Sequence, residues 1–262
     1  MCSDVKNNGF EAVIEVRNLV AHYGEQLVLN DVTLEVPKGE IFVVIGGSGC
    51  GKTTLLKHMT GLLTPTSGHI YYSGTDITTL DEDQLSSIQR HIGIAFQSGA
   101  LFNSLTVGEN VALPMREYTD MQEDLIEAMV LLKLSLVGLS AAKDLLPEQL
   151  SGGMKKRAGL ARAIALDPPI VYFDEPSAGL DPIMASGLDD LILDLKRLLG
   201  ITFIIVTHEL DSIKKIADHV LMLDGGQAVF RGTVQEAQQS SNKRVRQFFE
   251  RKADAHIQQH YT

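Results

Sequence analysis

The 262-residue chain contains no tryptophan and only two cysteines, Cys2 and Cys50. So few cysteines argue against a disulfide-stabilised fold and fit a reducing compartment. No apolar run approaches the roughly 20 residues that cross a bilayer, and residues 1–10 lack the apolar core of a signal peptide. The net charge of −10 argues against nucleic acid as the main ligand, because such ligands demand a basic surface. We therefore expect a cytoplasmic protein whose attachment to any membrane would go through a partner.

Strand patterns alternate with helical patterns along most of the chain. A continuous apolar run, Ile41 to Ile45, is typical of a strand buried on both faces. Other expected strands are residues 12–16, 32–36, 70–72, 92–96, 170–173, 203–206 and 220–223. Expected helices are residues 52–63, 183–199 and 210–217, and a helical subdomain is expected over about residues 98–165. This alternation predicts an α/β fold with a mainly parallel sheet that is covered on both faces.

A glycine-rich loop follows the apolar run and opens a helix. Its residues fit G-x-x-x-x-G-K-[ST] and are Gly46, Gly47, Ser48, Gly49, Cys50, Gly51, Lys52 and Thr53, with Thr54 next. Backbone N–H groups of such a loop face phosphates, and the helix N-terminus favours negative charge. Lys52 is expected to reach the β- and γ-phosphates, and the Thr53 hydroxyl to ligate Mg²⁺. An ordinary glycine-rich turn is the alternative, which the preceding strand and the spacing disfavour. The sequence therefore predicts a site for ATP and Mg²⁺.

Two acidic residues follow the predicted strand Ile170 to Phe173. Asp174 should emerge at the carboxyl edge of the sheet, where α/β proteins bind ligands, and is expected to hold Mg²⁺ or its waters. Glu175 should point to the other side of the strand end and is our candidate for the general base or water-orienting residue of hydrolysis. A solvated acidic turn would be the simpler interpretation without the glycine-rich loop upstream.

A third segment reads Leu150-Ser151-Gly152-Gly153-Met154. The Ser151 hydroxyl can donate to a γ-phosphate, and Gly152 and Gly153 allow close approach of the backbone. A helix expected from Met154 would offer its N-terminus to an anion. Because the glycine-rich loop already supplies one such helix end, a second one suits two surfaces that close on one ATP.

These three motifs, in this order, resemble those of ATP-binding-cassette (ABC) ATPases, and the resemblance covers about residues 12–235. It implies a RecA-like α/β core with a helical subdomain and a small antiparallel β subdomain, with residues 240–262 left as a C-terminal tail. It also implies a homodimer that hydrolyses two ATP at its interface.

The resemblance further assigns roles to four single residues. Gln97 would touch Mg²⁺ or the attacking water, and His208 would contact the γ-phosphate during catalysis. Asp181 would lie in a loop that crosses the dimer. Tyr23 could stack on adenine, although an aromatic residue there could equally belong to the core.

Several segments resemble one branch of the family, the ATPases of bacterial lipid-asymmetry and mammalian-cell-entry (MCE) systems. They are Met154, where most cassettes have Gln, and residues 97–107, 113–117 and 244–249. The resemblance implies phospholipid transport at the cytoplasmic face of the bacterial inner membrane. It implies an integral-membrane permease that meets residues 98–118, an MCE-domain substrate-binding protein and a small regulatory subunit.

Other interpretations share some of these motifs. The ATPase of an importer for amino acids or other small solutes shares every ATP motif. A non-transport ABC ATPase for repair or translation would carry a coiled-coil insertion or a second cassette. A kinase with a phosphate loop would leave Leu150 to Gly153 unexplained.

In the tail, Val245, Phe248 and Phe249 form an apolar stripe at helical spacing, which would pack either on the chain's own core or on a partner.

Overall fold

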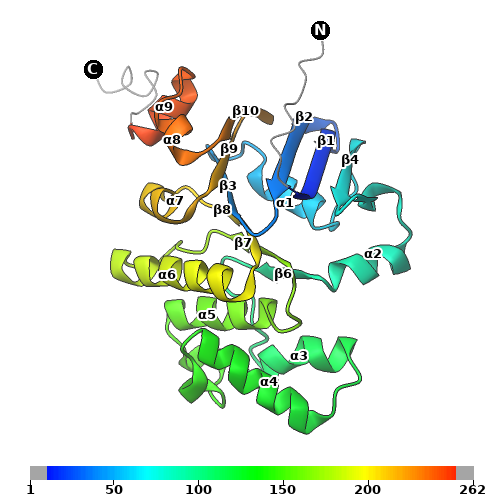
Figure 1. The fold of residues 1–262 in the computed structure, drawn as a ribbon, viewed down its shortest axis with the longest axis vertical. Coiled ribbons are helices and arrows are strands. Elements are labelled where there is room, and N and C mark those ends of the chain that lie inside the picture. Colours follow the sequence, from blue (N-terminus) through cyan, green and yellow to red (C-terminus); the bar gives the residue numbers. More distant parts are fainter. Residues whose placement is uncertain (1–10, 252–262) are drawn as a thin grey trace.

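The computed structural model describes residues 11–251, and residues 1–10 and 252–262 lie outside that description. Figure 1 shows a small antiparallel sheet at the upper right, a larger sheet through the centre, and helices stacked at the lower end. The predicted combination of an α/β core, a helical subdomain and a small antiparallel β subdomain is confirmed.

The central sheet has six strands. They are β3 (Ile41–Gly46), β6 (Ile92–Ala95), β7 (Ile170–Asp174), β8 (Thr202–Val206), β9 (His219–Asp224) and β10 (Gln227–Gly232). Their order is β10-β9-β3-β8-β7-β6, and all neighbours pair in parallel except β9 and β10. The expected parallel sheet is confirmed. The antiparallel edge strand β10 was not predicted, because its apolar run, Ala228 to Phe230, is short and is flanked by polar residues and glycine.

Alternate side chains of β3 enter two different cores, since successive residues of a strand point to opposite faces. Ile41, Val43 and Ile45 belong to a core shared with helices α5 (Gly152–Ala163), α6 (Pro182–Leu199) and α7 (Leu210–Ile216). Phe42 and Val44 belong to a second core shared with α1 (Lys52–Met59). Both faces of the central sheet are therefore covered, and its polar side chains emerge at the strand ends.

The smaller sheet covers the second core. Its antiparallel strands are β1 (Ala12–Tyr23), β2 (Gln26–Pro37), β4 (Ser67–Tyr72) and β5 (Thr75–Asp76), in the order β2-β1-β4-β5, and helix α2 (Glu82–Gln89) follows. β1 and β2 are longer than predicted because register shifts within their pairing interrupt the apolar–polar alternation. α2 was not predicted. α1 ends earlier than predicted, at Met59, and Gly61 at φ 72° turns the chain out of the helix.

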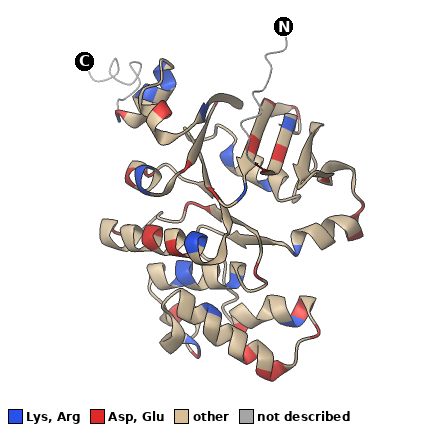
Figure 2. Ribbon diagram, in the orientation of Figure 1, with Lys and Arg blue, Asp and Glu red and all other residues tan. Residues whose placement is uncertain are grey.

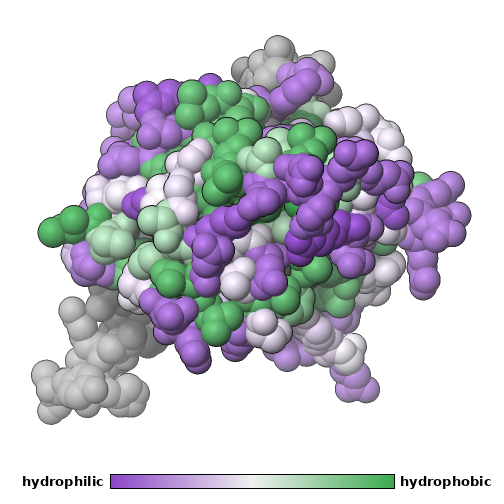
Figure 3. Space-filling view, turned by 90° about the horizontal axis from the view of Figure 1, so that it is seen from below, coloured by the Kyte–Doolittle hydropathy of each residue, from purple (hydrophilic) through white to green (hydrophobic). Residues whose placement is uncertain are grey.

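The helical subdomain consists of α3 (Val107–Tyr118), α4 (Glu123–Leu136) and α5. Thr106 and Glu109 form a capping box at the start of α3. α5 begins at Gly152, two residues before the predicted start, because Ser151 is its N-cap and accepts a hydrogen bond from the Met154 N–H. Short 3₁₀ turns occur at Ile77–Thr79, Ser140–Ala142 and Pro147–Gln149. Figure 3 views the molecule from this end and shows apolar patches between bands of polar side chains.

The C-terminal part packs on the core through α8 (Val234–Gln238) and α9 (Lys243–Phe249). Val245 and Phe249 are buried in the core shared with α5, α6 and α7, and Phe248 packs against it. Of the two alternatives for this stripe, the structure shows packing on the chain's own core, and residues 252–262 of the tail lie outside the described residues. Figure 2 shows charges of both signs spread over the helices. Within residues 11–251, no helix is long and apolar enough to span a bilayer.

Candidate nucleotide site

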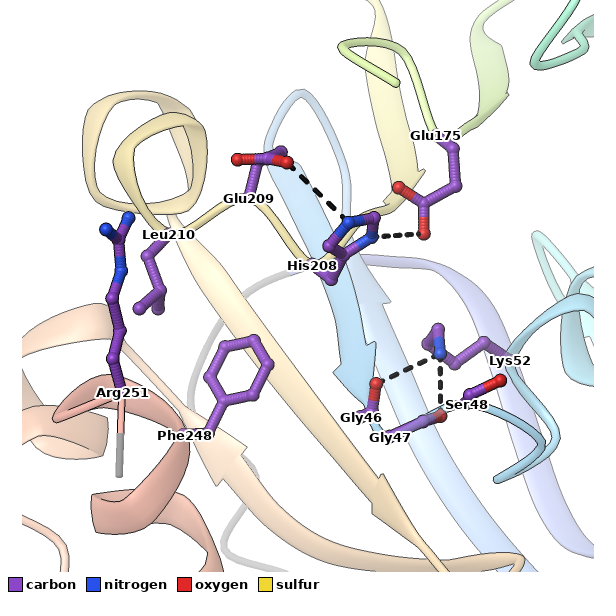
Figure 4. A pocket seen from close by; sticks show the side chains of 10 residues that line it. All are labelled: Gly46, Gly47, Ser48, Lys52, Glu175, His208, Glu209, Leu210, Phe248 and Arg251. Atoms are coloured by element: carbon purple, nitrogen blue, oxygen red, sulfur yellow. Dashed lines mark hydrogen bonds and ion pairs between the residues drawn. The ribbon is translucent and has the colours of Figure 1, made fainter. Parts of the chain in front are cut away.

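The predicted ATP residues meet at one edge of the central sheet. Because β3, β7 and β8 are parallel neighbours, the loops after them leave the sheet at the same edge. A cavity of 740 Å³ opens there (Figure 4). It is lined by Gly46, Gly47, Ser48, Lys52, Glu175, His208, Glu209, Leu210, Phe248 and Arg251. Residues far apart in the sequence therefore form one site.

The glycine-rich loop joins β3 to α1 in a conformation that needs glycine. Gly51 has φ 103°, and a Cβ there would lie 2.7 Å from Cδ2 of Leu29. A Cβ at Gly46 would lie 2.3 Å from the carbonyl oxygen of Leu223. Lys52 reaches back over the loop, and its Nζ donates hydrogen bonds to the carbonyls of Gly46 (3.0 Å) and Gly47 (2.9 Å). The lysine ammonium thus lies in the loop's concave side, as expected for a phosphate-binding group (Figure 4).

Cys50 is the one residue of this loop whose side chain turns inward. It is buried and joins the core beneath the loop. Burial raises the pKa of its thiol, while the nearby Lys52 charge opposes that shift. Only the backbone of Cys50 is therefore available to a phosphate, and its side chain fills space beneath the loop.

Asp174 is the last residue of β7 and is half-buried, level with Val206 of β8. Burial raises the pKa of its carboxyl, and the adjacent Glu175 raises it further, while Lys52 and Lys57 oppose the shift. A carboxylate whose charged form is disfavoured gains from a cation placed against it. Asp174 therefore has the electrostatics of a metal ligand.

Glu175 has an unusual backbone for a residue with a side chain, at φ 48°. Its N–H donates to the Val206 carbonyl at 2.8 Å, which ties the turn to β8. Its Oε1 lies 2.9 Å from the ring Nδ1 of His208, and its Oε2 is buried with no hydrogen-bond partner among the described residues. The His208 Nε2 lies 3.6 Å from Oε1 of Glu209. Figure 4 shows Glu175 and His208 pointing toward one another above Lys52, so the two side chains form a pair.

The remaining predicted residues do not line this cavity. Gly49, Cys50, Gly51, Thr53, Thr54 and Asp174 belong to the same two segments as its lining residues without lining it themselves. Ser151, Gly152 and Gly153 begin α5 in the helical subdomain, and Ser151 and Gly152 are exposed. Asp181 is the N-cap of α6 and accepts hydrogen bonds from the N–H groups of Ile183 and Met184, both at 3.0 Å. Within the described residues, neither the Ser151–Gly153 helix start nor Asp181 lines the cavity beside the phosphate loop of the same chain.

Tyr23 and Gln97 lie near the edges of the site. Tyr23 ends β1 at the turn into β2 and is 50% exposed. β2 passes the glycine-rich loop at Leu29, so the turn belongs to the strand pair that flanks the loop. Gln97 is exposed and follows β6, whose Ala95 pairs with Phe173 of β7. Both assignments stay predictions.

Three features of the site were not predicted. Phe248 and Arg251 line the cavity although they belong to the C-terminal segment, and no motif signals that placement. Glu209 lines it beside His208, and its position next to the predicted histidine could have suggested this. Lys156 of α5 is buried, and its Nζ donates to the carbonyl of Glu175 at 3.1 Å. A lysine near the start of an amphipathic helix reads as a surface residue in the sequence, so its burial was not foreseen.

The donor set fits a magnesium nucleotide. Mg²⁺ in nucleotide sites is held by one or two protein oxygens together with phosphate oxygens. The Thr53 hydroxyl in the first turn of α1 and the Asp174 carboxylate at the end of β7 offer such oxygens, and Lys52 and Lys57 of α1 lie close enough to Asp174 to act on its charge. The loop amides and Lys52 supply the positive side of a phosphate site.

Comparisons with known proteins give relatives of the chain in sequence and in fold. Residues 29–178 match the family described as ABC transporter. The chain is 42% identical over 249 residues to the intermembrane phospholipid transport system ATP-binding protein MlaF of Haemophilus influenzae, covering 95% of this chain and 94% of that protein. It is also 42% identical over 235 residues to the probable ribonucleotide transport ATP-binding protein mkl of Mycobacterium tuberculosis, covering 90% of this chain and 66% of that protein.

A solved structure extends the likeness to the fold. It is a dimeric ATP-binding cassette in a post-hydrolysis state, bound to ADP and Pi. It aligns with a TM-score of 0.77 at 30% identity and covers 84% of this chain and 98% of that one. Sequence and fold therefore point to the same family.

Proposed function

Because the chain belongs to the ABC transporter family of ATP-binding proteins, we propose that it is the ATPase subunit of a transporter that moves phospholipid, or a related hydrophobic molecule, across the bacterial cell envelope. The identity with a phospholipid transport protein, spread over 95% of the chain, supports the lipid assignment. An importer of amino acids or other small solutes is the alternative, since it would use the same ATP motifs.

One observation carries the proposal of a working dimer. The phosphate-loop cavity and the Ser151–Gly153 helix start lie in different parts of one chain, and the latter does not line the cavity. The cavity of one copy and the Ser151–Gly153 helix start of a second copy could together complete an ATP site, so the proposed site needs two copies. The dimeric, ADP-bound cassette with a similar fold supports this arrangement.

The chemistry follows from the cavity. Lys52 and the loop amides bind the phosphates, and Glu175 orients a water for attack on the γ-phosphorus and accepts its proton. The bond from the γ-phosphorus to the bridging oxygen breaks, which gives ADP and inorganic phosphate. His208, 2.9 Å from Oε1 of Glu175, orients that carboxylate and would donate to the γ-phosphate. When bound, Mg²⁺ would neutralise phosphate charge, held by Thr53 and Asp174 and approached by Gln97.

A Glu175→Gln variant tests the dimer and the chemistry together. Hydrolysis should fall by about 10²–10⁴-fold, because the amide cannot accept a proton. With hydrolysis blocked, ATP should hold the two copies together, so size-exclusion chromatography in ATP should show a dimer. Lys52→Ala is the control and should remain monomeric. A monomeric Glu175→Gln protein that still binds ATP, beside active wild type, would contradict the shared site.

The helical subdomain supports a membrane permease as the partner. Phe96, Phe102 and Tyr118 are exposed large aromatic residues, and a 290 Å³ pocket beside them is lined by Phe96, Pro114 and Tyr118 among others. Arg90 stacks on Tyr118, with 5.1 Å from Cζ to the ring centroid, and Arg162 stacks on Phe102 at 5.8 Å. Cation–π contacts hold these rings in place at the surface. We propose that residues 98–118 receive the permease at the cytoplasmic face of the inner membrane.

The branch resemblance adds an MCE-domain substrate-binding protein and a small regulatory subunit to the proposed assembly. A Phe102→Ser variant tests the permease contact, and it should lose co-purification with the permease while keeping ATP binding. Leu198→Ser, at an exposed leucine of α6, is the control. Equal recovery of the permease with both variants would contradict the proposed contact.

A further inference from the structure

The backbone of Glu175 is held in its unfavourable conformation from several sides. A residue with a Cβ at φ 48° persists only where its surroundings fix it. On the core side, the N–H donates to the Val206 carbonyl. The carbonyl accepts the N–H of Ala178 at 3.2 Å and the Nζ of Lys156 at 3.1 Å. Two of these contacts are local to the sheet edge and its turn, whereas the Lys156 contact comes from the helical subdomain.

Lys156 is an unusual lysine. It is only 5% exposed, and within residues 11–251 the Glu175 carbonyl is the one hydrogen-bond partner of its Nζ. A buried ammonium without a carboxylate partner is costly to keep. Burial lowers the pKa of Lys156, and the Glu175 charge opposes that shift. A functional role of Lys156 would account for the retention of a charge whose burial costs stability.

The other buried lysine of the helical subdomain shows the contrast. Lys133 of α4 is 1% exposed and forms an ion pair with Asp167, a residue that does not line the nucleotide cavity. Lys133 thus has the carboxylate partner that stabilises a buried charge. Lys156 instead directs its charge at the main chain of the candidate base.

The position of Lys156 on α5 links two parts of the site. It lies one helical turn after Gly153, on the helix whose N-terminus carries Ser151. The same helix turn contacts the segment after Glu175, since a Cβ at Gly153 would lie 2.7 Å from Cε of Met184 in α6. Because a helix moves as a rigid element, any shift of its N-terminus also shifts the Lys156 ammonium. In Figure 1, α5 lies directly beside α6 and below β7.

We propose that Lys156 is a positioning residue that holds the backbone of Glu175 in its hydrolytic conformation and ties it to the helix that begins at Ser151. This inference rests on the proposed function of the site. Lys156 touches neither the nucleotide nor the water in this arrangement; it acts through the placement of Glu175.

The test compares Lys156→Met with Lys156→Arg and with Lys133→Met in the full-length protein. Lys156→Met keeps the length of the side chain and removes the donor. We expect a fall in kcat of about 10–100-fold, because displacing a catalytic group by about 1 Å can cost that much, with the KM for ATP within about twofold of wild type. Lys156→Arg keeps a donor and should recover most of the turnover. Lys133→Met should lower the melting temperature but leave kcat near wild type.

A double-mutant cycle separates positioning from a general structural effect. In a Glu175→Gln background, the Lys156 substitution should change the residual hydrolysis by less than about twofold, because its effect acts through the missing carboxylate. A similar loss in both backgrounds would overturn the inference, as would wild-type kcat for Lys156→Met or equal kcat losses for the two lysine variants. Should Lys156→Met fail to fold, Lys156→Gln enters the same cycle. Wild-type protein that binds ATP without hydrolysing it would instead contradict the proposed function.

Discussion

The carboxyl edge of the central sheet and the surface of the helical subdomain use side chains in opposite ways. At the sheet edge, polar groups from β3, β7 and β8 converge on one cavity inside a single chain, and Glu175 and His208 already contact one another. On the helical subdomain, large apolar side chains face outward, among them Phe102, Leu125 and Leu132. The polar side chains of the sheet edge contact one another within the chain, whereas the apolar side chains of the helical subdomain face outward and are available to a partner.

This difference explains where the functional residues lie. A parallel sheet covered on both faces brings the ends of distant segments together without a partner. Ser151 and Gly152 at the start of α5 are exposed and do not line this cavity, so we expect them to meet a second surface. We therefore expect substitutions at the sheet edge to change the isolated protein, and those on the outer helical surface to change its assemblies.

The largest effect should come from Lys52→Ala at the sheet edge. It removes the ammonium that lies over the loop and about two charge-assisted hydrogen bonds to phosphate, which amounts to roughly 3–6 kcal/mol of binding free energy. Titration calorimetry with ATP should show binding near or beyond the detection limit. Lys38→Ala, which removes an exposed lysine paired with Glu11, is the control. An ATP affinity near wild type for Lys52→Ala would remove the lysine from the site.

Two leucines of α4 test the helical subdomain, and they differ chiefly in which way they face. Leu134 is 0% exposed and Leu132 is 50% exposed. Leu134→Ala should lower the free energy of unfolding by about 2–5 kcal/mol, because it leaves a cavity in the core. Leu132→Ala should change it by about 0.5 kcal/mol or less. Chemical denaturation of both variants measures the difference. Equal losses would mean that the exposed leucine is covered within the isolated chain.

A smaller effect is expected at His208, because it acts on a group that is already in place. His208→Ala should leave ATP binding nearly intact and slow turnover by about 10–100-fold, within the range for an oriented proton-transfer partner. Steady-state hydrolysis and calorimetry on one preparation measure both quantities. Turnover equal to wild type would show that the contact with Glu175 has no part in the chemistry.

The sheet edge was also the more predictable region. Short-range motifs point to the glycine loop, Asp174 and Glu175, the family resemblance adds His208, and a parallel sheet brings such segments to one edge. Lys156 could not be predicted, because its burial depends on how α5 packs against β6 and against Glu175 after β7, which no local pattern records. Phe248 and Arg251 were missed for the same reason. The register shifts in β1 and β2 hid the true strand lengths, since each shift reverses the facing of later side chains.

The smallest effect should be a pH dependence at the buried Asp189 of α6. Its side chain is buried and accepts a hydrogen bond from the Ser212 hydroxyl at 2.9 Å. Burial raises the pKa of this carboxyl above its ordinary value of 3.8; Ser212 and Lys215 oppose the shift and Asp190 adds to it. Between the ordinary and the raised pKa, the folded chain keeps a proton that the unfolded chain has released. Stability from this group is therefore present at low pH and is lost as pH rises through the folded pKa.

The Asp189→Asn side chain does not ionise. The melting temperature of this variant, relative to that of wild type, should therefore rise as pH goes from about 4 to about 7. Melting curves across that range measure the difference between the two proteins. Asp194→Asn, at an exposed residue of the same helix, controls for the removal of a charge from α6. Parallel pH profiles for wild type and Asp189→Asn would show that the buried carboxylate is stabilised as well as it is in water. Groups within the chain would then stabilise the buried charge of Asp189, as they hold the polar side chains at the sheet edge.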